Sequence, residues 1–309
     1  MRAAPISWAL LALILGCADR SLPLDPTDPP ANPLDPPTNE DPPDEPVPGT
    51  PGIYIADADG STSRLLAAGE WPAWSPDGSR IAFQRDGRIH VIGVDGTGET
   101  DLGPGSEPTW APDGARLAFT GSEGITVMQE DGTIEETLIR HDFRDDTYAE
   151  WDQGVGKPAW SSDGSRIAFE HLGDGDMTPA QIFVMNADGS EPRRVTPMQG
   201  GQYAESDPAW SPDGSMIVFW SYGYGIARVE ATGGTPRAIY LNFPAVAYGA
   251  KPSWSPDGST ILFTAGEFTP EGAVIWSVAA FGGDAGTLIP GAARAVWSPD
   301  GARLAFERR

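Results

Sequence analysis

Residues 72–84 read PAWSPDGSRIAFQ, and this thirteen-residue stretch decides the fold because the chain contains six copies of it. The tryptophans of successive copies are separated by 36, 50, 50, 44 and 43 residues. A repeat of about 40–45 residues is typical of the blades of a β-propeller. The later copies are PTWAPDGARLAFT from Pro108, PAWSSDGSRIAFE from Pro158, PAWSPDGSMIVFW from Pro208, PSWSPDGSTILFT from Pro252 and AVWSPDGARLAFE from Ala295.

Each copy predicts a strand, a tight turn and a second strand. In Ser-Pro-Asp-Gly the proline fixes φ, the aspartate bonds its own backbone and the glycine takes a positive φ. The alternation in Arg80–Phe83 places an apolar residue at every second position, as a half-buried strand requires. The third copy has Ser162 in place of proline, which we expect to loosen that turn. We interpret the repeated aspartates as turn residues and the six tryptophans as core or inter-blade packing residues.

A second hairpin with a glycine turn follows each of the first five copies, so two hairpins form one four-stranded blade. The second hairpins begin at Ile89, Ile125, Ile182, Ile226 and Val274. A sixth one, from Ile53, has no tryptophan hairpin before it, and the last tryptophan hairpin has no partner after it. We predict an all-β, six-bladed β-propeller of four-stranded antiparallel blades, closed two-plus-two between the N- and C-terminal hairpins. The folded body is 52–309, with blades 71–103, 107–140, 157–197, 207–241, 251–289, and 294–309 joined to 52–67.

The N-terminus is predicted to be a lipoprotein signal peptide over 1–16. Arg2 precedes a short apolar run from Ile6 to Leu15, which is too short to span a bilayer. Ile14-Leu15-Gly16-Cys17 resembles the bacterial lipobox, which implies lipidation of Cys17, the single cysteine of the chain. The alternative is an ordinary cleaved signal with a chance cysteine. Because Ala18 is not aspartate, the resemblance favours an outer-membrane lipoprotein, facing either the periplasm or the cell surface.

Residues 17–51 are predicted to be a lipidated cysteine followed by a disordered acidic tether. Twelve prolines and seven carboxylates lie between Ser21 and Pro51, without a cation. Such a composition cannot bury a core and favours an extended, polyproline-like spacer. A proline-rich ligand for a partner is the alternative.

The repeats resemble the WD40-like repeats of the TolB propeller family. Six copies of the Trp-Ser-Pro-Asp-Gly pattern, four of them exact, and second hairpins that consist of an apolar strand and a glycine turn carry the resemblance over the whole folded body. TolB has an α/β domain before its propeller, whereas a lipobox and a tether stand in that place here. The resemblance implies a cell-envelope propeller that binds proteins at its face.

Two enzyme families carry similar propellers. Prolyl-oligopeptidase-type peptidases need a G-x-S-x-G nucleophile elbow, which this sequence lacks. An oligogalacturonate lyase holds a metal through histidines, whereas this chain has only His90, His141 and His171. His90 lies on an expected strand, where packing or solvation is the more common role. A glycan-active, lyase-like propeller enzyme is nevertheless the alternative function.

The long insertions are 140–157, 170–181, 197–207, 241–251 and 264–273, and the strand order predicts that all of them lie on one face. They are rich in carboxylates and aromatic residues, with Lys157, Lys251, Arg140 and Arg144 as the only cations. An aromatic surface surrounded by charge is typical of recognition sites, although a solvated acidic rim is the alternative. The hypothetical binding residues are His141, Arg144, Asp145, Asp146, Tyr148, Trp151, Asp152, Tyr203, Tyr222, Tyr224 and Tyr248.

We predict a non-catalytic binding or scaffold propeller, without cofactors and monomeric, for an envelope protein or a peptidoglycan or glycan component. A structural or sensor repeat protein without a discrete ligand is a third possibility. A net charge of −24 argues against nucleic acid, which needs a basic footprint. No catalytic residue and no metal site is predicted. The weak calcium candidates are Asp174 and Asp176, and Asp59-Gly60 matches the position of a turn.

Overall fold

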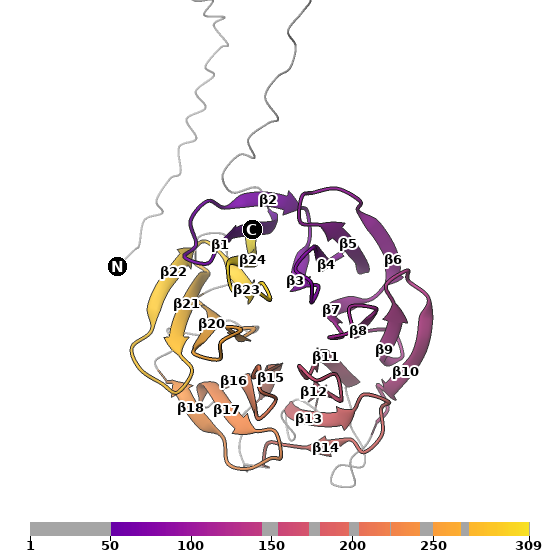
Figure 1. Ribbon diagram of the computed structural model, residues 1–309. Coiled ribbons are helices and arrows are strands. Elements are labelled where there is room, and N and C mark those ends of the chain that lie inside the picture. Colours follow the sequence, from indigo (N-terminus) through magenta and orange to yellow (C-terminus); the bar gives the residue numbers. More distant parts are fainter. Residues whose placement is uncertain are drawn as a thin grey trace, which may run out of the picture. The chain divides into compact units, whose positions relative to one another are not determined.

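The computed structural model describes residues 51–143, 154–172, 180–197, 204–222, 224–241, 250–266 and 272–308. These residues form twenty-four strands in six four-stranded antiparallel sheets. The sheets stand around a common central axis as the blades of a propeller, which confirms the predicted architecture (Figure 1). None of the described residues forms a helix that is long and apolar enough to cross a membrane.

The blades are numbered along the chain, each from its inner to its outer strand. Blade 1 contains β3 (Glu70–Trp74), β4 (Arg80–Arg85), β5 (Arg88–Gly93) and β6 (Thr100–Pro104). Blade 2 contains β7 (Ser106–Trp110), β8 (Arg116–Thr120), β9 (Gly124–Gln129) and β10 (Ile134–Arg140). Blade 3 contains β11 (Gly154–Trp160), β12 (Arg166–Leu172), β13 (Gln181–Asn186) and β14 (Arg193–Arg194).

The remaining three blades follow the same plan. Blade 4 contains β15 (Glu205–Trp210), β16 (Met216–Ser221), β17 (Gly225–Glu230) and β18 (Arg237–Tyr240). Blade 5 contains β19 (Ser253–Trp254), β20 (Thr260–Ala265), β21 (Val274–Ala279) and β22 (Gly286–Pro290). Blade 6 combines β23 (Ala293–Trp297) and β24 (Arg303–Arg308) with β1 (Gly52–Asp57) and β2 (Arg64–Ala67).

Blade 6 closes the ring with strands from both ends of the folded body. Its strand order is β2-β1-β24-β23, and β1 pairs with β24 from Gly52↔Arg308 to Asp57↔Arg303. The predicted two-plus-two closure is therefore confirmed. It pairs two strand edges that would otherwise remain open for association with other chains.

The turns of the tryptophan hairpins have the predicted chemistry. In the first copy Gly78 N donates to Ser75 O at 2.9 Å, and Ser79 N donates to the Asp77 carboxylate at 3.0 Å. Gly78 has a φ of 69°, a left-handed conformation that favours glycine.

The expected loosening of the third turn is not seen. Gly164 has the same φ of 69°, and its amide donates to Ser161 O at 2.9 Å. Ser162 replaces the missing proline with a contact of its own, because its Oγ donates to Pro212 O of blade 4 at 2.7 Å.

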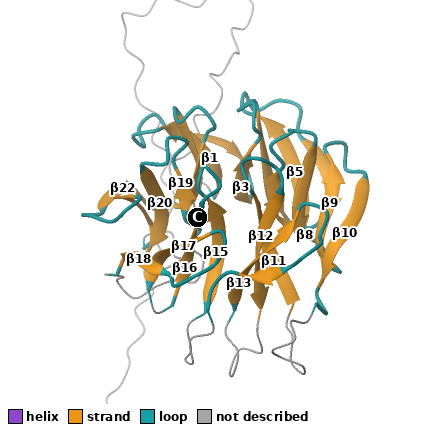
Figure 2. Ribbon diagram, turned by 60° about the horizontal axis from the view of Figure 1, so that its bottom comes forward, coloured by secondary structure: helices purple, strands orange, loops and turns teal. Residues whose placement is uncertain are grey.

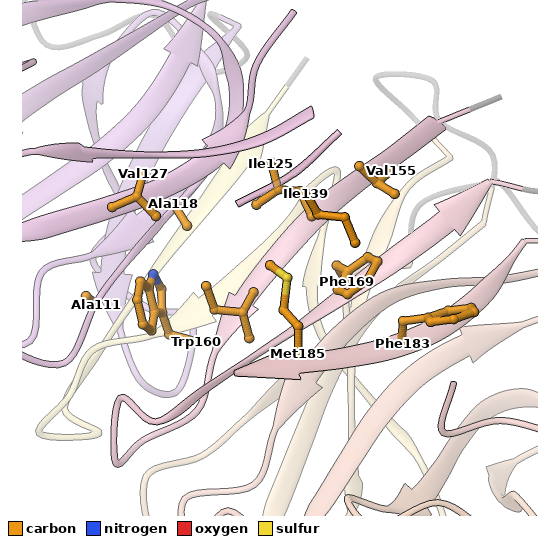
Figure 3. Close-up of a cluster of buried hydrophobic side chains, with 11 residues drawn as sticks. Ala111, Ala118, Ile125, Val127, Ile139, Val155, Trp160, Phe169, Phe183 and Met185 are labelled. Carbon is orange, nitrogen blue, oxygen red and sulfur yellow. The ribbon is translucent and has the colours of Figure 1, made fainter. Parts of the chain in front are cut away.

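The hydrophobic core lies between neighbouring blades. One cluster joins Ile125 and Ile139 of blade 2 to Trp160, Phe169 and Met185 of blade 3 (Figure 3). The tryptophans are seam residues as predicted, and Trp210 Nε1, for example, donates to Ala159 O across the seam at 3.0 Å. Every blade therefore depends on both neighbours for its burial.

The antiparallel order gives the propeller two different faces, between which the strands run (Figure 2). We call the face that carries the Ser-Pro-Asp-Gly turns the turn face. The opposite face, where each inner strand begins, is the connection face. The strand ends that flank the five long insertions, such as Arg140 of β10 and Gly154 of β11, all lie at the connection face. The middle of each insertion lies outside the described residues.

Candidate functional site in the channel throat

A β-bulge interrupts the inner strand of every blade just before the tryptophan. In blade 1, Glu70 pairs with Gln84 but Ala73 pairs with Ala82, so the inner strand holds one extra residue. The same shift occurs in the registers of blades 2, 3, 4 and 6. In blade 5 Thr264 N donates to Ala250 O, and further along the same segments Ser253 pairs with Leu262. The inner segment thus advances by three residues while its neighbour advances by two, so blade 5 contains the same extra residue.

The residue at each bulge adopts a left-handed conformation although none is glycine. Such a conformation costs of order 1 kcal/mol or more and re-aims the side chain. The six positions face the channel near its connection-face end, and we call them the throat ring. The ring consists of Trp71 (φ 59°), Glu107 (56°), Lys157 (51°), Asp207 (57°), Lys251 (36°) and Arg294 (53°).

The throat ring surrounds a cavity of about 160 Å³. Five of the six ring residues line it, together with the prolines that follow them, from Pro72 to Pro252. The prolines provide a rigid, largely apolar wall, and the ring side chains provide the polar groups. An apolar cavity with a few convergent polar groups is the usual composition of a ligand site.

The Trp71 indole is contacted by all three cations of the ring. The Arg294 guanidinium lies 4.0 Å from the ring centroid, Lys251 Nζ lies at 5.0 Å and Lys157 Nζ at 5.7 Å. Attraction between a cation and the face of an indole is worth about 1–2 kcal/mol when it is desolvated. Trp71 therefore stabilises a concentration of positive charge that would otherwise repel itself.

Lys157 is neutralised by carboxylates of blades 3 and 4. Its Nζ lies 3.2 Å from both Glu170 and Asp207, and it donates to Ser206 Oγ at 2.5 Å. Burial disfavours its charge, but Asp207 and Glu170 outweigh that effect and raise the pKa of Lys157 above its ordinary value. Lys157 therefore stays protonated, and its ion pairs link blade 3 to blade 4.

Arg294 is neutralised in the same manner at the seam between blades 6 and 1. Its Nη1 lies 2.9 Å from Glu307 and 3.4 Å from Glu70. Glu307 also accepts a bond from the backbone N–H of Trp71 at 2.6 Å, which holds the bulge of blade 1 in place.

Lys251 differs from the other two cations because its polar partner is a carbonyl. Its Nζ donates to Pro72 O at 3.1 Å. Within the described parts of the chain, no carboxylate forms an ion pair with it. Burial, reinforced by Arg294 and only partly offset by Glu307, lowers the pKa of Lys251 to about 8.

Four residues that the sequence analysis places in the long insertions belong instead to the inner strands and their bulges. Asp207 and Glu205 are 4% and 5% exposed, and Lys157 and Lys251 line the throat. The insertions therefore contain fewer charged residues than the sequence analysis predicts. A strand that begins with an irregular bulge cannot be distinguished from a loop in the sequence.

The predicted binding residues that the structure describes have different roles. Tyr222 follows β16 at the connection face and is 70% exposed, so it is available to a ligand. Tyr224 is half-buried against the core between blades 3 and 4. The other predicted binding residues except His141 lie outside the described residues, as do Cys17, Asp174 and Asp176.

His141 ties blade 2 to blade 3. Val155 N donates to its Nδ1 at 3.2 Å, so Nε2 carries the proton and donates to Gly121 O at 2.9 Å. Both ring nitrogens are thus used within the fold, which leaves neither for a ligand. His90 is buried on β5 and stacks on Phe83. In the described ranges, no group of three or more His, Cys, Asp or Glu side chains could hold a metal ion.

The throat ring was not recognised in the sequence, although a signal for it exists. When the six copies are aligned, the position three residues before each tryptophan is always charged or aromatic. The chain has only two lysines among its twenty basic residues, and both occupy this position. Their clustering becomes visible only once the repeats close into a ring.

Comparisons with known proteins agree on the fold. A family model described as the TolB beta propeller domain matches residues 143–309. A putative TolB from Agrobacterium tumefaciens has a TM-score of 0.65 at 22% identity, over 84% of this chain and 99% of that one. TolB from Acinetobacter baumannii has a TM-score of 0.58 at 17% identity, over 83% of this chain and 59% of that one.

An oligogalacturonate lyase in complex with manganese has a TM-score of 0.54 at 15% identity, over 82% of this chain and 77% of that one. At such identities the likeness to solved structures shows the fold alone. No curated protein matches the sequence.

Proposed function

The chain belongs to the TolB β-propeller domain family, and from this membership we propose that it is a non-catalytic binding propeller of the cell envelope. Its partner, an envelope protein or a cell-wall glycan component, binds at the connection face over the mouth of the channel. The observation that carries the proposal is the throat ring, an open cavity with charged groups and an indole at the face where the long insertions emerge.

The ring has the properties of a recognition site. Lys157 and Arg294 are already held by carboxylates, so their side chains are fixed before a ligand arrives. Preorganised polar groups reduce the entropy cost of binding. The exposed Tyr222 adds an aromatic contact at the same face, and aromatic side chains often dominate binding energy. We also propose that Tyr148 and Trp151 of the longest insertion, which lie outside the described residues, contribute to partner binding.

A crosslinking experiment with matched variants tests the location of the site. The full-length protein, crosslinked in intact cells, yields a partner that is identified by mass spectrometry and then purified. We expect Tyr222→Ala, and separately Tyr148→Ala with Trp151→Ala, to weaken binding of that partner at least about tenfold, as the loss of one aromatic anchor does.

The matched control is Phe281→Ala. Phe281 is 74% exposed, but it lies between β21 and β22 at the turn face. Its removal should leave partner binding unchanged. Loss of binding in Phe281→Ala, with no loss in the connection-face variants, would place the interface on the wrong side and refute the proposal.

We further propose that residues 1–16 are a signal peptide and that Cys17 is lipidated, with 18–51 as the spacer between the outer membrane and the propeller. The support is the Leu15-Gly16-Cys17 sequence and the proline-rich composition that follows. Cys17→Ser should move the protein from the membrane fraction to the soluble fraction and abolish incorporation of a labelled fatty acid. A variant that remains in the membrane fraction would contradict the anchor.

A further inference from the structure

The two lysines of this chain occupy equivalent positions in blades 3 and 5, yet their surroundings differ. Lys157 has two carboxylates at 3.2 Å. Lys251 has the Pro72 carbonyl at 3.1 Å and the Trp71 face at 5.0 Å. A lysine ammonium carries three donors, so the Pro72 carbonyl leaves most of the capacity of Lys251 unused. A charge held largely away from water is normally paired, and Lys251, which is half-buried and has no carboxylate partner among the described residues, therefore points to a missing anion.

The charged groups around Lys251 define what kind of anion fits. Arg294 of blade 6 shares the Trp71 face with it and reinforces the positive charge, although Glu307 and Glu70 already hold that guanidinium. Glu107 lies across the throat on blade 2, and Asp207 lies on the adjacent blade 4, where it pairs with Lys157. These carboxylates would repel a doubly charged phosphate more strongly than a singly charged group. The electrostatics therefore favour a monoanion.

The size of the cavity limits the ligand further. A cavity of about 150 Å³ holds a molecule as large as benzene, and the throat measures about 160 Å³. Its wall of prolines is apolar, so it suits a short carbon skeleton with one charged end.

We propose that the throat cavity beside Lys251 is a subsite for a single carboxylate group, carried by a ligand whose adjoining carbon atoms rest on the proline wall. The inference rests on the proposed function, because it names the chemistry that the channel mouth would recognise. A carboxylate could come from the end or side chain of a peptide, or from a sugar acid.

Amine labelling of the full-length protein tests the subsite, because the chain has only two lysines. At limiting succinimidyl acetate near pH 7, mass spectrometry of peptides resolves Lys251 from Lys157 in the same sample. Only the neutral amine reacts, so Lys251, with its pKa of about 8, should be acetylated at least about tenfold faster than Lys157. Equal rates at the two lysines would overturn the proposal.

Ligand protection then distinguishes a carboxylate site from a merely reactive lysine. Propionate should slow acetylation of Lys251 at concentrations on the order of 1–100 mM, as expected for a ligand of about five heavy atoms. The neutral isostere propionamide should not. Equal protection by both compounds, or by neither, would refute the subsite. N-acetylalanine represents a peptide carboxylate and glucuronate represents a sugar acid. The compound that protects Lys251 at the lower concentration identifies the class of ligand that supplies the carboxylate.

Substitutions provide an independent measurement that does not depend on labelling. Line broadening of ¹³C-labelled propionate in NMR spectra should be abolished by Lys251→Met and retained by Lys251→Arg, with melting temperatures similar to that of the original protein. Binding should be strongest below pH 8 and lost as the pH rises through that value, because the anion binds the protonated amine. Broadening that persists in Lys251→Met would place propionate elsewhere.

The two proposals fail separately. If propionate does not protect Lys251 while Tyr222→Ala still loses the crosslinked partner, the subsite is wrong and the binding face stands. If propionate protects Lys251 but no connection-face substitution weakens binding of the partner, the proposed function is wrong and the subsite stands.

Discussion

At the scale of single residues, the aspartates of the tryptophan hairpins act as carboxylates within their turns. Asp77 accepts bonds from Ser75 Oγ, Ser79 N and Ser79 Oγ. These bonds, led by that from Ser75, lower the pKa of Asp77 to about 2. Asp163 and Asp257 have the same environment and also titrate near 2.

These turns should make the propeller sensitive to acid. Because the folded pKa lies below the unfolded value of 3.8, their stabilisation is present above about pH 4 and is lost as the pH falls towards 2. We expect the melting temperature to drop over this window. Asp77→Asn should lower it by a few degrees at pH 7 and weaken its dependence on acid. A melting temperature that is constant from pH 5 to pH 2 would contradict this account.

The pKa of Glu205 is raised, unlike that of the turn aspartates, because its side chain is buried at the start of β15. Burial raises its pKa to about 7, against partial compensation by Thr196, the backbone of Ile182 and Arg194. A raised carboxyl pKa means that stability decreases as the pH rises from about 4.5 through 7.

Glu205→Gln removes that cost without changing the shape of the side chain. We expect it to stabilise the protein at pH 8 by up to about 3 kcal/mol, and the gain should shrink towards pH 4.5. Urea unfolding of both proteins at the two pH values measures the difference. A variant that is less stable than the original protein at pH 8 would show that Glu205 makes an essential bond as a carboxylate.

At the scale of elements, the seams between blades share one cation–π contact. In four of the six copies the residue six positions after the motif tryptophan is an arginine that lies over the tryptophan of the next blade, as Arg166 lies 4.6 Å from the centroid of Trp210. The contact recurs for Arg80 over Trp110, Arg116 over Trp160 and Arg303 over Trp74. Blades 4 and 5 have Met216 and Thr260 at this position.

The seam after blade 5 can therefore be strengthened. Thr260→Arg should place a guanidinium over Trp297 and raise the free energy of unfolding by about 0.5–1 kcal/mol. The matched control is Arg166→Thr, which removes an existing contact of this kind. It should lower the free energy of unfolding by at least the same amount, because Arg166 also donates to Gly214 O at 3.2 Å. Thermal unfolding compares both variants with the original protein, and destabilisation by Thr260→Arg would argue against a common seam geometry.

The inner strands show where sequence interpretation failed and why. The turns, the alternation and the seam tryptophans follow from local chemistry, and these were predicted correctly. The sequence does not predict the bulge before each tryptophan, because a residue before proline is expected to be extended, whereas Trp71 and the four other ring residues that precede proline are left-handed. Lys157 and Lys251 were consequently assigned to loops rather than to the throat. The bulge depends on strand pairing, which a single copy of the motif does not reveal.

At the scale of the whole molecule, stability depends on closure, because each hydrophobic cluster is shared by two blades. Gly52 and Arg308 are paired residues of β1 and β24, so the two ends of the folded body lie side by side. Joining them with a short linker and opening the exposed turn between Gly98 and Glu99 should keep the ring intact. We expect this permutant of 52–309 to unfold cooperatively, within a few degrees of the original propeller.

Deletion of 296–309 tests the same dependence from the other direction. It removes β24 and the last two residues of β23, which leaves the edge of β1 unpaired and uncovers the apolar faces of blades 5 and 1. Size-exclusion chromatography should show aggregation, and thermal unfolding should lose its single transition. A truncated protein that stays monomeric and unfolds cooperatively would mean that closure contributes little.

The sequence alone determined the six blades, their turns, the sharing of blade 6 and the residues of the seams. All of these follow from a short pattern that is repeated, so each copy supports the interpretation of the others. Only the tertiary structure decided which side chains meet in the throat, because Trp71, Lys157 and Lys251 come from three blades and approach one another only when the repeats close into a ring. The tertiary structure also decided how strongly each of the two lysines holds its proton. The pKa of a lysine depends on its burial and on the carboxylates that other strands place beside it.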